Sequence, residues 1–327
     1  MSKHFKNPKE GNIDNSGFGT NSAEEGGRLT NKDGTTNLRK TGMPVWDRIS
    51  IYHTLIRMQR GPFLLLVFLF YTSINVIFAS IYFINGVEHL IGNDGSQQPW
   101  RQFMDAFFFS AQTLTTVGYG HVAPTGMAAN TVAAVESLIG ILIFALVTGL
   151  FYGRFARPRA YLIFSDNVLV APYKNGRAVM FRVATYKNNH LTDVSAQVTI
   201  AMHIIDDGKQ VTRFYPLPLE ISNVNSLALS WTVVHHLNEK SPLYGFTKQE
   251  ILDARFELII SMKAFDDHFS NTVLQRTSYT YRELLYGERF LPMFHKADNG
   301  DYTILELDKI NDHEAALVQE PEINTFA

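Results

Sequence analysis

The residues in this chain whose types and spacing most clearly allow a specific chemistry are Thr116, Val117, Gly118, Tyr119 and Gly120. Their backbone carbonyl oxygens, with the Thr116 hydroxyl below them, could form a column of ligands, and four such columns around one axis would replace the hydration shell of a monovalent cation. The two glycines have no Cβ, so they can adopt the φ values that turn successive carbonyls inward. Val117 and Tyr119 would then point outward, where they could pack against a supporting helix.

A glycine-rich hairpin turn is the ordinary alternative, because Gly-Tyr-Gly alone is common in loops. The pentapeptide lies, however, between two apolar stretches, residues 62–84 and 128–152, each long enough to cross a bilayer. Non-helical backbone occurs at membrane depth only where it is buried in protein or lines a water-filled cavity. The flanking sequence therefore favours a re-entrant, cation-binding segment.

The two apolar stretches differ in their polar content. The first has no charged residue, and the second contains one, Glu136. Placing an ionisable group in hydrocarbon costs free energy. We therefore expect Glu136 to support the pentapeptide from behind or to line the upper part of a water-filled cavity. Gly140 and Gly149 interrupt the second stretch and are candidate bending points.

Two shorter helices are expected beside these stretches. Residues 100–114 are too few to cross a bilayer and end at the pentapeptide, so the negative C-terminal end of this helix would favour a cation there. Residues 44–60 have the pattern of an amphipathic helix lying in the membrane interface, with Trp46 as an anchor. A surface helix of a soluble domain would show the same pattern.

The distribution of positive charge predicts the orientation in the membrane. Between the first apolar stretch and the pentapeptide, Arg101 is the only Lys or Arg. Six arginines flank the other ends of the two stretches: Arg48, Arg57, Arg60, Arg154, Arg157 and Arg159. The positive-inside rule therefore places both termini in the cytoplasm.

From Tyr161 onward the apolar period changes to two. Residues 194–204 alternate between apolar and more polar side chains, and similar runs occupy residues 162–172, 178–186, 227–234, 256–264 and 272–281. Several short strands separated by turn residues predict an antiparallel β-sandwich.

Composition narrows the classes of function. The chain has no cysteine, which excludes disulfides and thiolate metal sites, and its formal net charge of −2 gives no support to a nucleic-acid partner. No nucleophile–base pair, metal-ligand cluster or dinucleotide fingerprint stands out, so an enzyme is the weakest interpretation. Residues 1–43 are rich in small polar side chains and are expected to be disordered, and residues 311–327 form a loose tail.

Taken together, the sequence resembles the inward-rectifier potassium channels, in particular their prokaryotic branch. The likeness covers roughly residues 44–310. Besides the pentapeptide, it rests on three runs: Arg154-Phe155-Ala156-Arg157-Pro158-Arg159-Ala160, Ser241-Pro242-Leu243-Tyr244-Gly245 and Arg276-Thr277-Ser278-Tyr279.

The resemblance implies a homotetramer in the inner cell membrane. It would conduct K⁺ passively through a pore on the four-fold axis of the tetramer. Each subunit would have an interfacial helix at residues 44–60, a two-helix pore domain with a pore helix at residues 61–159, and a cytoplasmic all-β, immunoglobulin-like sandwich at residues 160–310. No organic cofactor is implied. Gating would depend on anionic phospholipid and on a conformational change of the inner helix bundle.

The resemblance also implies roles for single residues. K⁺ would be bound by the backbone of Thr116, Val117, Gly118 and Tyr119, within a selectivity filter that ends at Gly120. Tyr152 corresponds to the residue that forms the hydrophobic gate in the family. The alternative interpretation is that Tyr152 belongs to the belt of aromatic residues at the membrane interface. Arg154, Arg157 and Arg159 correspond to residues that bind anionic phospholipid, with topology control as the alternative.

Two positions depart from the family pattern. Gln112 stands where many members carry a pore-helix glutamate, so the ion pair that braces the filter in those members is not expected here. Phe144 stands where strong rectifiers have an acid in the cavity, so rectification is expected to be weak. The competing function is a membrane-anchored β-sandwich that binds or scaffolds a partner without conducting ions.

Overall fold

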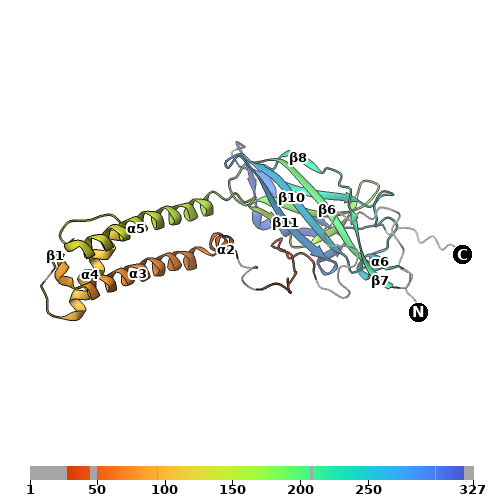
Figure 1. Ribbon diagram of the computed structural model, residues 1–327. Coiled ribbons are helices and arrows are strands. Elements are labelled where there is room, and N and C mark those ends of the chain that lie inside the picture. Colours follow the sequence, from red (N-terminus) through yellow and green to blue (C-terminus); the bar gives the residue numbers. More distant parts are fainter. Residues whose placement is uncertain (1–27, 45–49, 94, 207–208, 299, 320–327) are drawn as a thin grey trace. The chain divides into compact units, whose positions relative to one another are not determined.

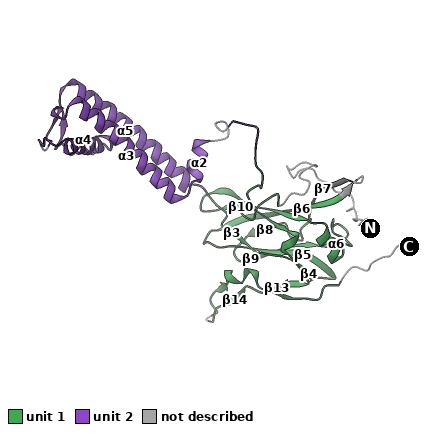
Figure 2. Cartoon of the chain, turned by 90° about the horizontal axis from the view of Figure 1, so that it is seen from below, with its two compact units in different colours: residues 1–40, 158–327 green, residues 41–157 purple. Residues whose placement is uncertain are grey.

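The computed structural model describes residues 28–44, 50–93, 95–206, 209–298 and 300–319. The chain divides into two compact units, residues 41–157 and residues 1–40 with 158–327 (Figure 2). Each is described by itself.

The first unit is helical. Its elements are α2 (Ile51–Arg57), α3 (Arg60–Asn85), the short 3-10 helix η1 (Val87–His89), β1 (Leu90–Ile91), α4 (Pro99–Leu114), β2 (Ala123–Pro124) and α5 (Gly126–Phe155). α3 and α5 lie side by side and α4 lies between them at one end (Figures 1 and 2).

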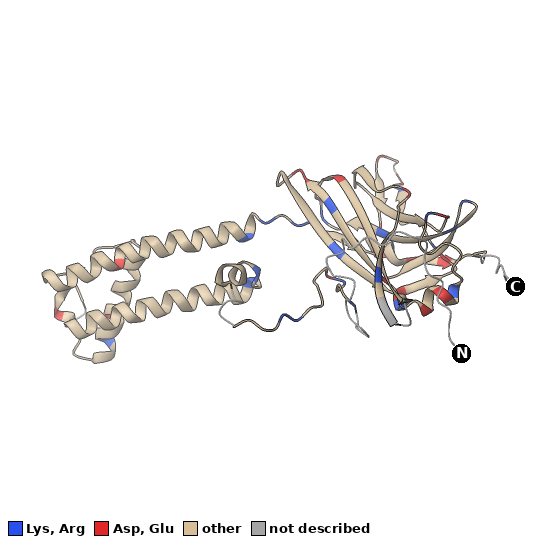
Figure 3. Cartoon of the chain, turned by 45° about the vertical axis from the view of Figure 1, so that its right-hand side comes forward, with Lys and Arg blue, Asp and Glu red and all other residues tan. Residues whose placement is uncertain are grey.

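The long helices α3 and α5 are long and apolar enough to cross a membrane. Only 17% and 11% of their most apolar windows are buried, whereas the core helix of a soluble protein would be mostly buried. Both are uncharged over most of their length, and arginines gather at the end next to α2 (Figure 3). The two expected spans are confirmed and are a few residues longer than the apolar stretches.

The ends of these helices follow from local chemistry. α3 begins at Arg60, ahead of Pro62, because a proline in the first turn lacks only an N–H that has no partner within the helix. It ends at Gly86, whose φ of 99° favours glycine. Within the expected interfacial helix, residues 44–60, the described residues form α2, whose start Ser50 caps with a hydroxyl that accepts from the His53 N–H. Trp46 lies outside the described residues.

The second unit is a β-sandwich. One sheet has the order β11-β10-β6-β7, with β8 paired to β6, and the other has the order β12-β4-β5-β3, with β9 paired to β5. Its strands are β3 (Leu162–Phe164), β4 (Val168–Tyr173), β5 (Gly176–Thr185), β6 (Leu191–Asp206), β7 (Lys209–Pro216), β8 (Asn223–Ser226), β9 (Ser230–His236), β10 (Glu257–Asp266), β11 (Asn271–Thr280) and β12 (Leu284–Tyr286). Smaller elements are α6 (Lys248–Asp253), η2 (Tyr281–Glu283), β13 (Glu288–Phe290), β14 (Phe294–Lys296), β15 (Thr303–Leu305), η3 (Leu307–Asn311) and β16 (His313–Ala315).

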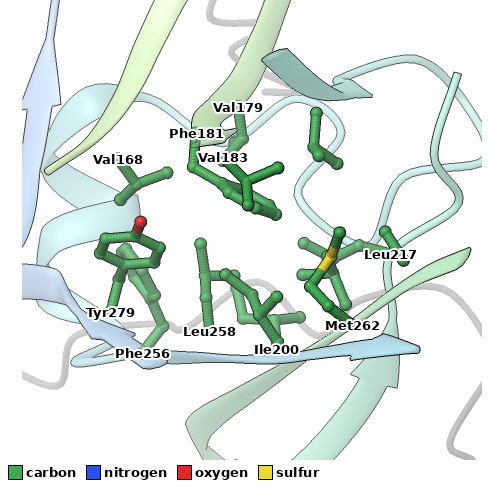
Figure 4. Close-up of a cluster of buried hydrophobic side chains, with 14 of the residues drawn as sticks. Val168, Val179, Phe181, Val183, Ile200, Leu217, Phe256, Leu258, Met262 and Tyr279 are labelled. Atoms are coloured by element: carbon green, nitrogen blue, oxygen red, sulfur yellow. The ribbon is translucent and has the colours of Figure 1, made fainter. Parts of the chain in front are cut away.

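The core of the sandwich lies between the two sheets (Figure 4). In β6 the predicted alternation holds, since Val194, Ile200 and Met202 are buried and belong to this core. One pairing departs from the antiparallel prediction, because β12 runs parallel to β4. The chain reaches β12 from β11 of the opposite sheet through η2, so the two paired strands are not neighbours in sequence.

The prediction that residues 1–43 are disordered is wrong for the segment that begins at Arg28. Its guanidinium donates to the Ser278 hydroxyl at 2.8 Å, and the backbone N–H groups of Leu29 and Thr30 donate to the buried Glu257 carboxylate at 2.6 and 2.9 Å. Composition does not reveal this contact, because the segment is fixed by backbone amides and charged groups and not by apolar side chains. Residues 1–27 lie outside the described residues.

The predicted tail at residues 311–327 is likewise ordered at its start. β16 pairs with β13, and Arg289 contacts Glu314 at 2.5 Å. The strand was not predicted because the segment has few apolar residues. Its pairing is made by backbone hydrogen bonds, which leave no apolar pattern in the sequence.

A buried histidine explains one of the sequence runs. His235 is 2% exposed, its Nδ1 lies 2.6 Å from the Pro218 carbonyl oxygen, and its Nε2 lies 2.8 Å from the Ser241 hydroxyl. The Ser241 hydroxyl also accepts from the Leu243 N–H, so a neutral imidazole holds the turn that starts at Ser241. Burial lowers the pKa of His235 to about 4.

This histidine predicts a loss of stability in mild acid. In the unfolded chain His235 takes up a proton near pH 6.5, whereas in the folded chain it resists protonation down to about pH 4. Its contribution is therefore complete above pH 6.5 and is lost, by roughly 3 kcal/mol at most, as the pH falls toward 4. Thermal unfolding of the full chain between pH 7 and 4.5 should show a smaller loss for His235→Gln than for wild type. The exposed His268→Gln should keep the wild-type slope, and equal slopes in all three would contradict the assignment.

Candidate functional site

The Thr116–Gly120 loop begins directly on the end of α4. Thr116 N donates to the Thr113 carbonyl at 3.0 Å, and the N–H groups of Val117 and Gly118 donate to the Gln112 carbonyl at 3.0 and 3.4 Å. These carbonyls belong to the last turn of α4, where no further helical N–H is available to them. The loop is thus fixed at its start by backbone hydrogen bonds, and Gln112 acts here through its carbonyl group.

The backbone of the loop alternates in handedness. Thr116, Gly118 and Gly120 have φ values of 58°, 50° and 79°, and the residues between them do not have positive φ. Alternation of this kind allows successive carbonyls to point to one side, as expected for the two glycines. Positive φ at Thr116 was not expected, because a β-branched residue rarely adopts it.

The two large side chains of the loop are not covered by their own chain. Val117 is 53% exposed and Tyr119 is 80% exposed. Packing of these two side chains against a supporting helix stays a prediction, because no helix of this chain covers them. Further along the chain, Phe144 and Tyr152 of α5 are 74% and 75% exposed.

Glu136 forms a buried polar network behind α4. It is fully buried, and its two carboxylate oxygens lie 2.7 Å from the Tyr82 hydroxyl of α3 and 2.5 Å from the Ser110 hydroxyl of α4. The Ser110 hydroxyl also lies 3.1 Å from Asn75 Oδ1. One carboxylate therefore joins all three helices, which agrees with support of the filter from behind. Its complete burial contradicts the alternative of a cavity-lining acid.

Gly140 has a packing role. A Cβ built at this position would lie 2.0 Å from the Leu114 carbonyl oxygen, so α5 passes against the end of α4 at a distance that only glycine allows. α5 is helical throughout from Gly126 to Phe155, and bending at Gly140 stays a prediction. A Cβ at Gly149 would meet nothing within 4 Å, so bending there stays a prediction.

Arg154 contacts the end of α2. Its guanidinium donates to the Leu55 carbonyl, to the Met58 carbonyl at 2.7 Å, and stacks 4.2 Å over the ring of Phe63. Cations at a helix C-terminus satisfy its last carbonyls in this way. Two of the three guanidinium nitrogens of Arg154 thus donate within the chain, and lipid binding by Arg154 stays a prediction. Arg157 and Arg159 are exposed.

Comparison with known proteins identifies the family. A model of the inward rectifier potassium channel C-terminal domain matches residues 162–325, and an ion channel model matches residues 65–157, which include the filter loop. The inward rectifier potassium channel Kirbac3.1 of Paramagnetospirillum magnetotacticum is 30% identical over 275 residues, which are 84% of this chain and 91% of the relative. This chain belongs to the inward-rectifier potassium channel family.

Animal members of the family match over a similar part of the chain. The inward rectifier potassium channel irk-1 of Caenorhabditis elegans is 23% identical over 299 residues, 85% of this chain and 55% of the relative. The ATP-sensitive inward rectifier potassium channel 12 of Gallus gallus is 26% identical over 300 residues, 83% of this chain and 68% of the relative. The inward-rectifier fold and the membrane location expected from the sequence are confirmed, and the family is one of ion channels, not of enzymes.

Sequence reasoning missed the side chains that form the network around Glu136 in this inward rectifier. Asn75, Tyr82 and Ser110 lie on other helices, and no spacing along the chain indicates that they meet. Asn75, a polar residue within an apolar span, was the one available signal. Among the described residues, no group of three or more His, Asp or Glu side chains is placed to hold a metal ion.

The network predicts a large cost for a small change at Ser110. Ser110→Ala removes the hydroxyl that lies between Glu136 and Asn75, and it leaves the buried Glu136 carboxylate with one donor fewer. The free energy of unfolding should fall by roughly 1–3 kcal/mol. Ser73→Ala is the matched control, because the exposed Ser73 hydroxyl contacts only a carbonyl of its own helix. Thermal unfolding in detergent measures both, and equal melting temperatures would remove the network from the argument.

Proposed function

We propose that this chain is one subunit of a potassium-selective channel whose pore is lined by four copies of the Thr116–Gly120 loop. The observation that carries the proposal is the loop itself, with positive φ at alternate residues, set on the C-terminal end of α4 between two helices long enough to span the bilayer. Backbone carbonyls in this arrangement are suited to replace the water around K⁺. The negative end of the α4 dipole adds to the attraction for a cation.

Four copies are needed because one loop supplies one side of the ion's coordination shell. The exposed side chains of Val117 and Tyr119 support assembly, since large apolar groups at membrane depth are expected to contact lipid or another subunit. Members of this family whose names are given above are potassium channels, which is consistent with K⁺ as the permeant ion. We therefore infer a homotetramer with K⁺ and no organic cofactor.

The orientation follows from the basic residues that flank α2 and the end of α5. By the positive-inside rule, both termini and the β-sandwich lie in the cytoplasm, and for a bacterial chain the membrane is the inner one. Arg157 and Arg159 are exposed and can contact anionic headgroups, which attract each basic residue by about 1 kcal/mol. Rectification is weak in this proposal, because Phe144 offers no carboxylate to internal Mg²⁺ or polyamines; strong block of outward current by internal spermine would contradict it.

The proposal is tested by rubidium uptake into liposomes that contain the purified chain. Uptake should be driven by a K⁺ gradient, blocked by barium and absent when Na⁺ replaces Rb⁺. Gly118→Ala should abolish it, because an L side chain is strained at a φ of 50° and the carbonyls would rotate. Gly61→Ala, in the first turn of α3 where an added Cβ meets nothing within 4 Å, should conduct as wild type.

The same vesicles, prepared with and without anionic phospholipid, test the lipid dependence. An Arg157→Gln, Arg159→Gln double variant should lose most of the response to anionic lipid while its rubidium selectivity is unchanged. Absence of rubidium uptake in every lipid would instead support the non-conducting membrane-anchored protein.

We propose further that Tyr152 forms the gate at the cytoplasmic end of the pore. Its ring is exposed on the last turns of α5, so four copies could close a hydrophobic constriction that excludes water. Tyr152→Ala should raise rubidium flux under closed-state conditions, whereas Tyr152→Phe, which keeps the ring, should not. Closed-state flux that is the same in wild type and Tyr152→Ala would place Tyr152 in the interfacial belt.

A further inference from the structure

A short β-ribbon joins the outer loop to the chain that leaves the filter. β1 (Leu90–Ile91) pairs antiparallel with β2 (Ala123–Pro124), so that Leu90 lies opposite Pro124 and Ile91 opposite Ala123. At the end of the ribbon, the N–H and the hydroxyl of Thr125 both donate to the His89 carbonyl, at 2.7 and 3.1 Å. The ribbon lies at the end of the helical unit that is far from α2 (Figure 1).

Gly92 brings the outer loop into direct contact with the filter exit. A Cβ built on Gly92 would lie 1.8 Å from the carbonyl oxygen of His121, the residue that follows Gly120. The φ of Gly92 is 90°, a value that side-chain-bearing residues rarely adopt. The two backbones therefore approach at a distance that only glycine permits.

The ribbon is also fixed to the rest of the unit. Leu90 is 2% exposed and packs in a buried cluster with Phe78, Tyr82 and Phe109 of α3 and α4. The outer loop thus transmits the position of the helices to the filter exit. Because the chain contains no cysteine, this link is made by backbone hydrogen bonds and close packing alone.

The filter loop is held at its two ends. The carbonyls of Gln112 and Thr113 fix its start, and the ribbon fixes the segment after Gly120. Along the loop, a Cβ at Gly118 or Gly120 would meet no atom of the chain within 4 Å, so its own subunit does not pack closely against these glycines. The spacing of the outer carbonyls therefore depends on where the ribbon places the exit.

We propose that Gly92 and the β1–β2 ribbon position the outer end of the filter and thereby set the ion selectivity of the channel. Gly92 is in this account a positioning residue, which acts through His121 and does not touch the ion. The inference rests on the proposed channel function. Selection between ions depends on the arrangement and field of the coordinating carbonyls, so a displaced exit alters selectivity without any change in filter sequence.

The test is Gly92→Ala in the full chain, reconstituted in liposomes. The new Cβ would lie 1.8 Å from the His121 carbonyl oxygen, so the two backbones must separate by about 1.6 Å or more to reach an ordinary contact distance. We expect the preference for Rb⁺ over Na⁺ in uptake to fall by about tenfold or more, the equivalent of a 1.4 kcal/mol change in discrimination. Gly95→Ala is the matched control, because Gly95 lies in the same loop and has a φ of 64°, but an added Cβ would meet nothing within 4 Å. It should keep wild-type selectivity.

A second pair of variants decides the question if Gly92→Ala does not assemble. Thr125→Val removes the hydroxyl bond to the His89 carbonyl and keeps the backbone bond. Its selectivity should shift in the same direction as that of Gly92→Ala by a smaller amount, and Thr125→Ser, which retains the hydroxyl, should restore it. A general loss of folding would lower uptake of both ions without changing their ratio.

The outcomes separate the two proposals. If the wild-type chain takes up no Rb⁺, the channel function itself fails. If the wild type selects Rb⁺ and both Gly92→Ala and Thr125→Val select it equally well, the channel function stands and the role of the ribbon is overturned.

Discussion

The constraint on which the rest of this structure depends is that the proposed filter, the Thr116–Gly120 loop, is made of backbone. Carbonyl oxygens have no side-chain torsions of their own, so their positions are decided wholly by what holds the main chain. Hydrogen bonds from Thr116, Val117 and Gly118 to the last carbonyls of α4 hold one end of the loop. The Glu136 network and the close approach of Gly140 in turn position α4.

Besides the apolar packing of α4 on α3, two contacts hold α4 by different physical means. The Glu136 carboxylate accepts hydrogen bonds from Tyr82 and Ser110, so it ties α3, α4 and α5 together where water cannot compete. Gly140 has no side chain, so α5 can approach the end of α4 closely. The close packing at this contact makes the end of α4 rigid. A glutamate on the pore helix would be one way to brace a filter, but this chain has Gln112 there and places its buried acid on α5 instead.

The sequence predicted the elements of this protein well and its tertiary contacts poorly. The two spans, the pore helix, the sandwich and the family followed from hydropathy, period and the pentapeptide, because each is a local pattern along the chain. Three contacts join segments that are far apart in sequence: the network around Glu136, the contact of Gly92 with His121, and the hydrogen bonds of residues 28–30 to Glu257 and its neighbours. A single sequence holds no record of which distant residues meet. For the same reason, Arg154, Arg157 and Arg159 are all interpreted from the sequence as lipid-binding residues, although Arg154 contacts α2 and the other two are exposed.

Arg154 links the interfacial helix to the end of the inner helix. It stands two residues after Tyr152 and binds the carbonyls of Leu55 and Met58 at the end of α2. A side chain added at Gly153 would meet Tyr52 and Ile56 of α2 at 3.3 and 3.4 Å, so the two helices are already close there. The last turn of α5 cannot move outward without either carrying α2 with it or separating a guanidinium from its acceptors. If Tyr152 gates the channel as proposed, its movement is coupled to α2 by this charge-assisted contact.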